Sequence, residues 1–298
     1  MSGGGGSRPD LQDVLPNRRA TRAGSHKKTL WLRAQQLVPS SSSLASTLTR
    51  QETAIRLRSH FVQAVARARW AAAKKTQSQD GCCIPGAPPP EPPECLPLAG
   101  LRNRDVKPVD WAMTLGQWNT FVHACKETEI WPQVEEKKGY VNLFDLNSNF
   151  VKPWTRETGA SVALRMNPIR PLRAQLMISH SWAEDIDECE EALNMFCQRE
   201  GIPLDTPVWF CLFAQYQAGG ELHDPGPTVQ EQLDMDPFKH VIEAVRRSYG
   251  MVVIHTTRAE VYERLWCVKE ISDAHRKGCP MKAACSASYV ESSRGRLL

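Results

Sequence analysis

The sequence predicts an α/β fold in which buried parallel strands alternate with helices. Residues 251–254 form a continuous, mostly β-branched apolar run, which is short enough for a strand buried on both faces. A helix with one apolar face precedes this run, and a second helix follows it after a polar loop. The second helix carries Glu270, which therefore lies beyond the carboxyl end of a parallel strand, where open α/β sheets bind ligands.

The preceding elements follow the same alternation. Residues 176–179 are predicted as the first strand, and Asp185 or Asp187 can cap a helix that ends at Gly201. Residues 208–213 have almost no polar interruption and are predicted as the second strand. Residues 214–236 are expected to form a long loop, which in a compact domain usually has a functional role.

The two helices around residues 251–254 have their own signals. Pro237 suits a first helical turn, and the apolar residues that follow at spacings of three and four end before Gly250, which is expected to stop the helix. Thr257 and Glu260 have capping-box spacing, so the second helix is expected to start near Arg258. On that helix, Tyr262, Trp266 and Glu270 share one face, and a neighbouring buried stripe is expected from Leu265, Val268 and Ile271.

Two blocks of this region are similar to a known family. Residues 266–271, WCVKEI, on the second helix, and residues 179–185, SHSWAED, after the first strand, resemble the Toll/interleukin-1 receptor (TIR) family, especially its plant-type members. The resemblance covers residues 176–277. It implies a flavodoxin-like parallel sheet, self-association and, in some members, cleavage of NAD at the nicotinamide bond. It also leaves the family's C-terminal part incomplete, because a TIR domain continues with further strands and a helix where few residues remain here.

The resemblance places the catalytic glutamate of those enzymes at Glu270. A carboxylate in that position can stabilise an oxocarbenium-like centre and hold ribose hydroxyls. Trp266 is then a packing partner, and Ser179, Trp182 and Asp185 are candidate walls of the substrate pocket.

Simpler roles remain open for these residues. Glu270 can be a helix-surface residue that pairs with Arg264 or Lys277, and Asp185 can be a charge on a protein–protein interface. His255, at the end of a buried strand, is a candidate general base or a structural residue with ordinary hydrogen bonds.

Composition bounds the class of protein. The chain has 298 residues, of which 41% are hydrophobic, without a run that could span a membrane or form a signal-peptide core. Its ten cysteines are scattered through a chain too long to need a disulfide scaffold, so reduced thiols and a cytoplasmic location are expected. No spacing typical of a zinc site, a P-loop, a dinucleotide-binding turn or a serine-hydrolase elbow occurs, so neither a metal nor a resident cofactor is predicted.

Residues 1–100 are predicted to be a basic, disordered arm. They carry 14 Lys/Arg and 6 Asp/Glu, whereas the other 198 residues carry 23 and 27. The glycine, serine and proline runs of this arm cannot bury enough apolar surface to fold. The acid-free stretch at residues 18–50 leaves a transit peptide open as an alternative.

Residues 52–75 are the part of the arm most able to form a helix. Apolar and basic residues interleave there, and such a basic amphipathic helix can bind a calmodulin-like protein or an anionic membrane surface. The alternative is a solvated helix that packs only on a partner.

Residues 101–175 are predicted to be a Trp-rich α+β extension, followed by the TIR-like domain at 176–280 and a tail at 281–298. Thr114 can cap a helix with an apolar stripe, and residues 141–150 alternate in a way that predicts strand and turn. The tryptophans are expected in a core rather than on a nucleic-acid platform, because glutamates dilute the positive charge around them. The extension can also supply extra strands to the sheet, and residues 281–285 can form one short strand.

The leading functional hypothesis is an intracellular TIR-like signalling module that acts through self-association or with other TIR-like domains. The first alternative is an NAD hydrolase that uses Glu270, with NAD as substrate. The second is a calmodulin-regulated adaptor that acts through residues 52–75. No nucleic-acid partner is predicted.

Overall fold

The structure, a computed structural model, describes residues 89–97, 100–217 and 223–295. Most of the expected N-terminal arm, including the helix expected at 52–75, lies outside these residues. Within the described part of the chain, no helix is both long and apolar enough to cross a membrane.

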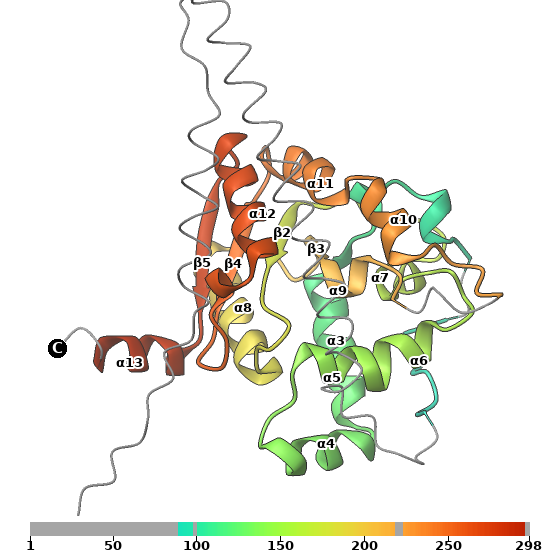
Figure 1. Ribbon diagram of the computed structural model, residues 1–298, viewed down its shortest axis with the longest axis horizontal. Helices are drawn as coiled ribbons and strands as arrows, with labels where there is room; N and C mark the ends of the chain where they lie inside the picture. The colour runs from blue at the N-terminus through green and yellow to red at the C-terminus, as the bar shows by residue number, and fades with distance from the viewer. Residues whose placement is uncertain (1–88, 98–99, 218–222, 296–298) are drawn as a thin grey trace, which may run out of the picture. The chain divides into compact units, whose positions relative to one another are not determined.

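A mixed sheet forms the centre of the described residues (Figure 1). It has five strands in the order β1-β3-β2-β4-β5, of which β2 to β5 are parallel and β1 is an antiparallel edge strand on β3. The strands are β1 (Met113–Thr114), β2 (Leu176–Ser179), β3 (Pro207–Phe210), β4 (Gly250–His255) and β5 (Met281–Cys285). This confirms the predicted α/β class, and β2 has the predicted bounds.

Helices cover both faces of the sheet. In chain order the helices and helical turns are η1 (Asn103–Asp105), η2 (Pro108–Asp110), α3 (Leu115–Lys126), α4 (Ile130–Lys138), α5 (Leu143–Leu146), the π-helical η3 (Asn147–Val151), α6 (Lys152–Thr155), α7 (Val162–Met166), α8 (Ile186–Glu200), α9 (Cys211–Ala214), α10 (Val229–Asp234), α11 (Pro237–Val245), η4 (Val261–Glu263), α12 (Leu265–Arg276) and α13 (Ala287–Gly295).

Two apolar cores lie on the two faces of the sheet, because side chains alternate along each strand. One core contains Ile178 and Ile254 together with buried side chains of α3 and α8. The other contains Met177 and Val253 together with side chains of α11 and α12. The strand-to-helix crossovers of the parallel strands therefore lie on opposite faces of one sheet.

The capping signals of α3 and α8 act as expected. Thr114 forms a complete capping box with Gln117 at the start of α3. Asp185 caps α8, and Gly201 ends it with a φ of 64°. For α11 the predicted start at Pro237 is confirmed, but the helix ends at Val245 without using Gly250. Gly250 instead begins β4 with a φ of 78°, and a Cβ there would lie 2.2 Å from the Pro280 carbonyl oxygen.

Residues 143–150 are helical and Asn142 forms only an isolated bridge to Asp185, so the prediction of strand and turn at 141–150 is wrong. Asn142 and Asp145 form a capping box that starts α5, and their polar side chains are turned to the backbone rather than to solvent. The buried residues Leu143, Leu146 and Phe150 then follow at spacings of three and four, which is the helical period.

The extension at 101–175 packs into the same core as the strands. Trp118 of α3 lies 5.8 Å from Phe210 of β3, and Phe121 lies 5.3 Å from Phe213, between ring centroids. The extension also supplies β1, so the alternative that it adds a strand to the sheet is confirmed. The four tryptophans expected in a core are all buried: Trp111, Trp118, Trp131 and Trp154.

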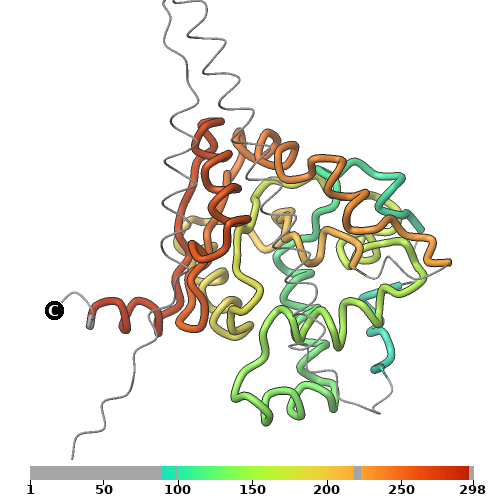
Figure 2. The backbone as a smooth tube through the Cα atoms, in the orientation of Figure 1, coloured from blue at the N-terminus to red at the C-terminus, as the bar shows by residue number. Residues whose placement is uncertain are grey.

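The described start of the chain, at residues 89–97, packs against this extension (Figure 2). Trp154 Nε1 donates a hydrogen bond of 2.8 Å to the Pro90 carbonyl. Arg165, only 3% exposed, donates to the carbonyls of Trp154, Leu96 and Pro97. This buried guanidinium therefore depends on carbonyl groups of the segment before residue 100.

Residues 281–298, predicted as a tail, also contribute regular structure. Met281–Cys285 forms the edge strand β5, paired in parallel with β4, and α13 follows. The Ser286 hydroxyl donates a 2.7 Å hydrogen bond to Glu188 of α8, which joins this segment to the domain.

Candidate functional site

Helix α12 starts later than predicted. Thr257, expected in a capping box with Glu260, donates hydrogen bonds from its amide and hydroxyl to Glu188 of α8 instead. The helix begins at Leu265, after a 3-10 turn, and Arg264 occupies its N-cap without a side-chain hydrogen bond. The loop after β4 is therefore extended, and it brings Arg264 to the carboxyl end of the sheet.

The later start changes which face of α12 is buried. Tyr262 lies outside the helix and is 58% exposed, whereas Leu265 and Val268, expected in a buried stripe, are 37% and 40% exposed. Cys267 and Glu270, three residues apart, form the buried face instead.

Glu270 is held over the carboxyl end of β2. Its Oε2 accepts a hydrogen bond of 2.7 Å from the Ser179 hydroxyl, and its side chain is almost fully buried. Ser179 is the last residue of β2, and β3 and β4 lie on opposite sides of that strand. The carboxyl group is therefore at the point where the chain connections leave in opposite directions, the usual ligand crevice of open α/β sheets.

The protonation of Glu270 is poised near neutral pH. Burial raises its pKa from 4.5 to about 7, and the hydrogen bond from Ser179 partly opposes this rise. The positive charges of Arg264 and Lys269 also oppose it. A carboxyl group with such a pKa can exist in either state under physiological conditions and is suited to chemistry.

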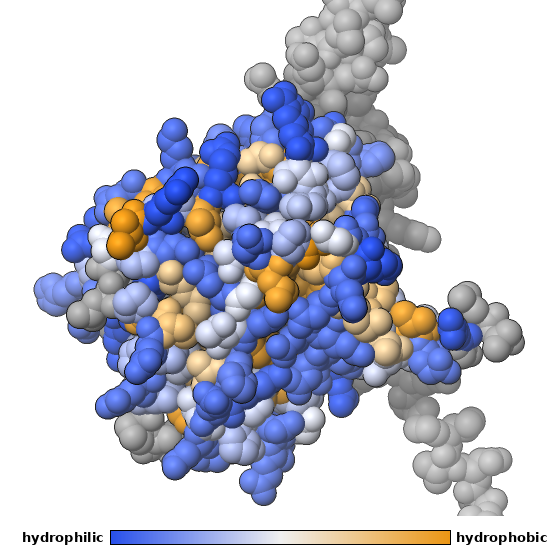
Figure 3. Space-filling model, turned by 180° about the vertical axis from the view of Figure 1, so that it is seen from behind, coloured by the Kyte–Doolittle hydropathy of each residue, from blue (hydrophilic) through white to orange (hydrophobic). Residues whose placement is uncertain are grey.

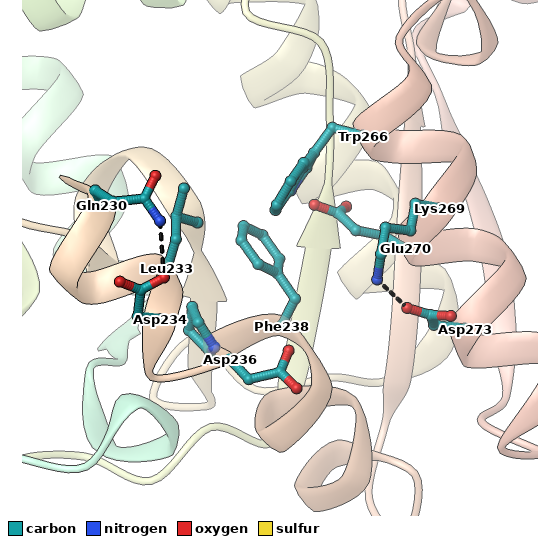
Figure 4. A pocket seen from close by; sticks show the side chains of 10 residues that line it. Gln230, Leu233, Asp234, Asp236, Phe238, Trp266, Lys269, Glu270 and Asp273 are labelled. Atoms are coloured by element: carbon teal, nitrogen blue, oxygen red, sulfur yellow. Dashed lines mark hydrogen bonds and ion pairs between the residues drawn. The ribbon is translucent and has the colours of Figure 1, made fainter. Parts of the chain in front are cut away.

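A pocket of about 250 Å³ opens beside Glu270, between α10, α11 and α12 (Figure 4). The rings of Trp266 and Phe238 meet edge to face with centroids 4.9 Å apart, and the Glu270 carboxyl points toward this pair. The residues that line the pocket are Gln230, Leu233, Asp234, Asp236, Pro237, Phe238, Trp266, Lys269, Glu270 and Asp273.

This pocket has an excess of acidic groups. Asp234, Asp236 and Asp273 line it together with Glu270, against the single ammonium group of Lys269. Lys269 is bound to Asp273 at 2.6 Å, and Asp273 is also paired with Arg276. Asp236 is paired with Lys239 at 3.5 Å, so Asp234 and ionised Glu270 contribute most of the excess negative charge. The pocket therefore favours a ligand that carries positive charge.

A buried polar network fixes the α10 wall. The Gln232 side chain accepts a hydrogen bond of 2.8 Å from the Tyr216 amide and donates one of 2.9 Å to the Tyr216 carbonyl. The Tyr216 hydroxyl donates to Asp224 at 2.8 Å, and a Cβ on Gly226 would lie 2.0 Å from the Tyr216 ring. Residues 214–236, predicted as one long loop, thus contain α10, and hydrogen bonds join Tyr216 to Asp224 and Gln232 within this segment.

A second, smaller cavity of about 20 Å³ shares Trp266 and Glu270 as walls. Its other lining residues are Ile178, His180, Trp182, Cys211, Arg264 and Cys267. His180 Nε2 lies 3.3 Å from Cys211 Sγ, and the Cys267 thiol donates to the His180 carbonyl at 3.1 Å. Cys211 itself belongs to α9, because the strand predicted at 208–213 ends at Phe210.

Burial makes this histidine–thiol pair unreactive. It lowers the pKa of His180 to about 3 and raises the pKa of Cys211 to about 12. Both groups are therefore neutral near pH 7, and a thiol in that state is a poor nucleophile. Among the described residues, no group of three potential ligand side chains is arranged to hold a metal ion.

The predicted pocket residues are only partly together. Trp182 and Trp266 line the small cavity with Glu270, and Ser179 donates a hydrogen bond to Glu270, but neither Ser179 nor Asp185 lines either cavity. The Asp185 carboxylate accepts hydrogen bonds from amides in the first turn of α8, which turns it away from the site. His255 also lies apart, packed between the rings of two tyrosines.

Sequence analysis missed several residues that line the pocket. Lys269 and Asp273 flank Glu270 on α12, so helical spacing could have indicated them. Phe238 was assigned to the core, and Asp234 and Asp236 to a loop, without any signal that they face Glu270.

Comparisons with protein-family models, curated proteins and solved structures found no match to this chain.

Proposed function

We propose that this chain is a TIR-like protein with a flavodoxin-like sheet, and that its Glu270 pocket cleaves the bond between ribose and nicotinamide in oxidised nicotinamide adenine dinucleotide (NAD⁺). The order β3-β2-β4-β5 of the parallel strands supports the sheet type, since the first strand lies between the second and the third. The observation that carries the reaction is Glu270, a buried carboxyl group with a pKa of about 7 in a pocket at the carboxyl edge of the sheet.

The charge of the pocket suits the reacting end of this substrate. The nicotinamide ring is a pyridinium cation before cleavage, and positive charge moves to the ribose as the bond breaks. Asp234, Asp236 and ionised Glu270 can stabilise both charges, and the faces of Trp266 and Phe238 can contact the ring. A pocket of about 250 Å³ fits the nicotinamide ribose end of the dinucleotide rather than the whole molecule.

The reaction balances without a cofactor. The bond between ribose C1′ and the pyridinium nitrogen breaks, and its electron pair goes to the ring nitrogen, which gives neutral nicotinamide. The oxocarbenium ion that remains adds water at C1′ and releases a proton, which gives ADP-ribose. Ionised Glu270 acts electrostatically and by holding ribose hydroxyl groups.

The direct test is nicotinamide release from NAD⁺ by the full chain. Glu270→Gln keeps the size of the side chain and removes its charge, so we expect release to fall at least about 100-fold. Glu136→Gln, on the exposed surface of α4, is the matched control and is expected to retain activity. Failure of the folded wild-type protein to release nicotinamide would refute the reaction, and full activity of Glu270→Gln would refute the role of this residue.

A second candidate function is self-association through α12. Tyr262, Leu265 and Val268 form an exposed apolar patch at the start of this helix, here called the α12 patch. Figure 3 shows one face of the molecule, on which apolar side chains gather in several patches separated by hydrophilic side chains. We expect Val268→Lys to lower the oligomeric state in sedimentation experiments, with Thr120→Lys on exposed α3 surface as the control.

A further inference from the structure

Three segments from different parts of the chain meet at the carboxyl edge of the sheet, on the side of Glu270 away from the acidic pocket. The Phe144 amide donates to the Trp182 carbonyl at 3.3 Å, which joins the extension to the loop after β2. The loop after β4 lies against the same part of the extension, because the Arg258 guanidinium carbon is 4.8 Å from the Tyr140 ring centroid. Residues of the extension therefore form part of the surface at this edge of the sheet.

Aromatic rings hold the cationic groups of this surface in place. Lys138 Nζ lies 4.9 Å from the Tyr140 centroid, and the Arg264 guanidinium carbon lies 6.0 Å from the Phe144 centroid. Phe144 in turn packs against Trp182 with centroids 5.4 Å apart. These side chains are defined here as the basic–aromatic surface: Lys138, Tyr140, Phe144, Trp182, Arg258 and Arg264.

The two arginines carry charge that no nearby carboxylate neutralises directly. Lys138 is paired with the buried carboxylate of Asp145. For Arg258 and Arg264, in contrast, no ion pair within 4.0 Å is found among the described residues. A guanidinium group presents several donors in a fixed plane, so both groups remain able to bind an anion.

The acidic groups around the arginines offset them only in part. Glu184 is fully buried, and burial raises its pKa well above the usual value, which favours its neutral form. Glu270 is only partly ionised near pH 7. Glu260 and Glu263, in the same loop as the arginines, and Glu188 of α8, whose pKa is lowered in part by the charge of Arg258, are further opposing charges.

This surface is adjacent to the reacting group. Arg264 and Trp182 line the small cavity whose wall includes Glu270 and Trp266. A nucleotide whose ribose contacts Glu270 from the acidic pocket can therefore place its next group near Arg264. In a dinucleotide that group is the diphosphate.

We propose that Arg258 and Arg264 bind the phosphate groups of a nucleotide, with Tyr140 and Phe144 of the extension as positioning residues for the two guanidinium groups. The substrate assignment rests on the proposed function, but the binding site itself does not. Planar guanidinium groups bind phosphate oxygens in pairs of hydrogen bonds, and stacking on a ring reduces the freedom lost on binding.

The test measures binding without turnover, by calorimetry on the full chain with ADP, inorganic pyrophosphate and adenosine. We expect ADP and pyrophosphate to bind and adenosine to bind at least about tenfold more weakly. Arg258→Ala is expected to weaken ADP and pyrophosphate about tenfold, whereas Arg173→Ala, which removes an exposed arginine on another part of the surface, has no effect.

Two further variants test the positioning role. Tyr140→Ala is expected to weaken ADP about threefold, and Tyr140→Phe, which keeps the ring, is expected to bind as the wild type does. Equal binding of ADP and adenosine, or unchanged ADP binding by Arg258→Ala, would overturn the proposal. ADP contains no nicotinamide, so the two proposals can fail separately. If the wild-type protein releases nicotinamide but does not bind ADP, only the phosphate site is refuted. If it binds ADP but releases no nicotinamide, only the proposed reaction is refuted.

Discussion

The two sides of Glu270 differ in charge and in origin. On one side, the pocket between α10, α11 and α12 carries aspartates and a compensated lysine. On the other side, the basic–aromatic surface carries two arginines from the segment between β4 and α12, each of which lies over an aromatic ring of the extension. The same carboxyl group and the same indole, Glu270 and Trp266, form walls toward both.

This difference indicates what kind of ligand the site suits. A ligand with positive charge at one end and negative charge a few bonds away matches both sides at once, whereas a uniformly charged ligand matches only one. NAD⁺ has this distribution, because one ribose links its pyridinium ring to its diphosphate. Charge complementarity of this kind contributes specificity more than affinity.

The largest expected effect is the loss of unfolding free energy that results from burying the ionised Glu270 carboxylate between the two sides. Its pKa is about 7 in the folded protein and near 4.5 when exposed. Between these values the folded state retains a proton that the unfolded state releases, so the contribution of Glu270 to stability is fully present below pH 4.5 and is lost as pH rises through 7. The difference corresponds to about 3 kcal/mol.

Glu270→Gln removes this titration. We therefore expect the unfolding free energy of the variant, minus that of the wild type, to rise by about 3 kcal/mol between pH 4.5 and pH 8. Urea unfolding at both pH values measures it. Glu263→Gln, which changes an exposed glutamate, is expected to follow the wild type. Parallel stability curves for Glu270→Gln and the wild type would contradict the burial of the charge.

The next effect tests whether the acidic side is a separate structural unit. Gln232→Leu keeps the shape of a buried side chain but leaves the Tyr216 amide and carbonyl without their partners. We expect a loss of about 2 kcal/mol in unfolding free energy, because both groups are buried. Calorimetry is expected to find weaker binding of the 1-methylnicotinamide cation and unchanged binding of ADP.

Gln133→Leu, on the exposed face of α4, is the matched control for this variant. If Gln232→Leu weakens both ligands equally, the two sides do not act independently.

A smaller effect concerns the hydrogen bond that ties Glu270 to the sheet. Ser179→Ala removes a donor that favours the ionised carboxylate, so the pKa of Glu270 is expected to rise further. The loss of about 1 kcal/mol moves the midpoint of the pH profile upward by about 0.7. Nicotinamide release at pH 7 falls and recovers at pH 9, whereas Ser179→Thr, which keeps the hydroxyl, retains the wild-type profile. A lower rate with an unshifted profile would assign Ser179 a purely structural role.

The sequence predicted one side of this comparison better than the other. Apolar runs and helical spacing were sufficient to place Glu270 beyond the strand ends, and the resemblance to the TIR family indicated Ser179 as a neighbour. The α10 wall depends on Gln232 and Tyr216, whose contacts are long-range and leave no periodic pattern. Asp185 was assigned to the pocket because it follows β2, but capping of α8 uses its carboxylate.

The basic–aromatic surface was not predicted for a related reason. Its rings belong to the extension, where the alternation at 141–150 indicated a strand, and only the helical conformation of α5 places Phe144 beside Trp182. A local capping box decided that conformation against the apparent strand pattern.

The smallest effect tests the charge difference itself. Asp236 lines the acidic pocket with a side chain that is 49% exposed and has a φ of 51°, a conformation that Asn also tolerates. Asp236→Asn therefore removes one charge, together with its ion pair to Lys239 at 3.5 Å, and leaves the backbone unstrained. Water screens a charge this exposed, so we expect the affinity for 1-methylnicotinamide to fall only about twofold at low salt and the difference to disappear at about 1 M salt.

Asp205→Asn, at an exposed position outside the pocket, is the control and is expected to have no effect. ADP affinity discriminates between a local and a general effect of the charge. If the acidic groups act only within their own pocket, Asp236→Asn leaves ADP binding unchanged, just as Arg258→Ala leaves 1-methylnicotinamide binding unchanged. If each variant changes both ligands by the same factor, the protein's overall field, and not two opposed surfaces around Glu270, controls binding.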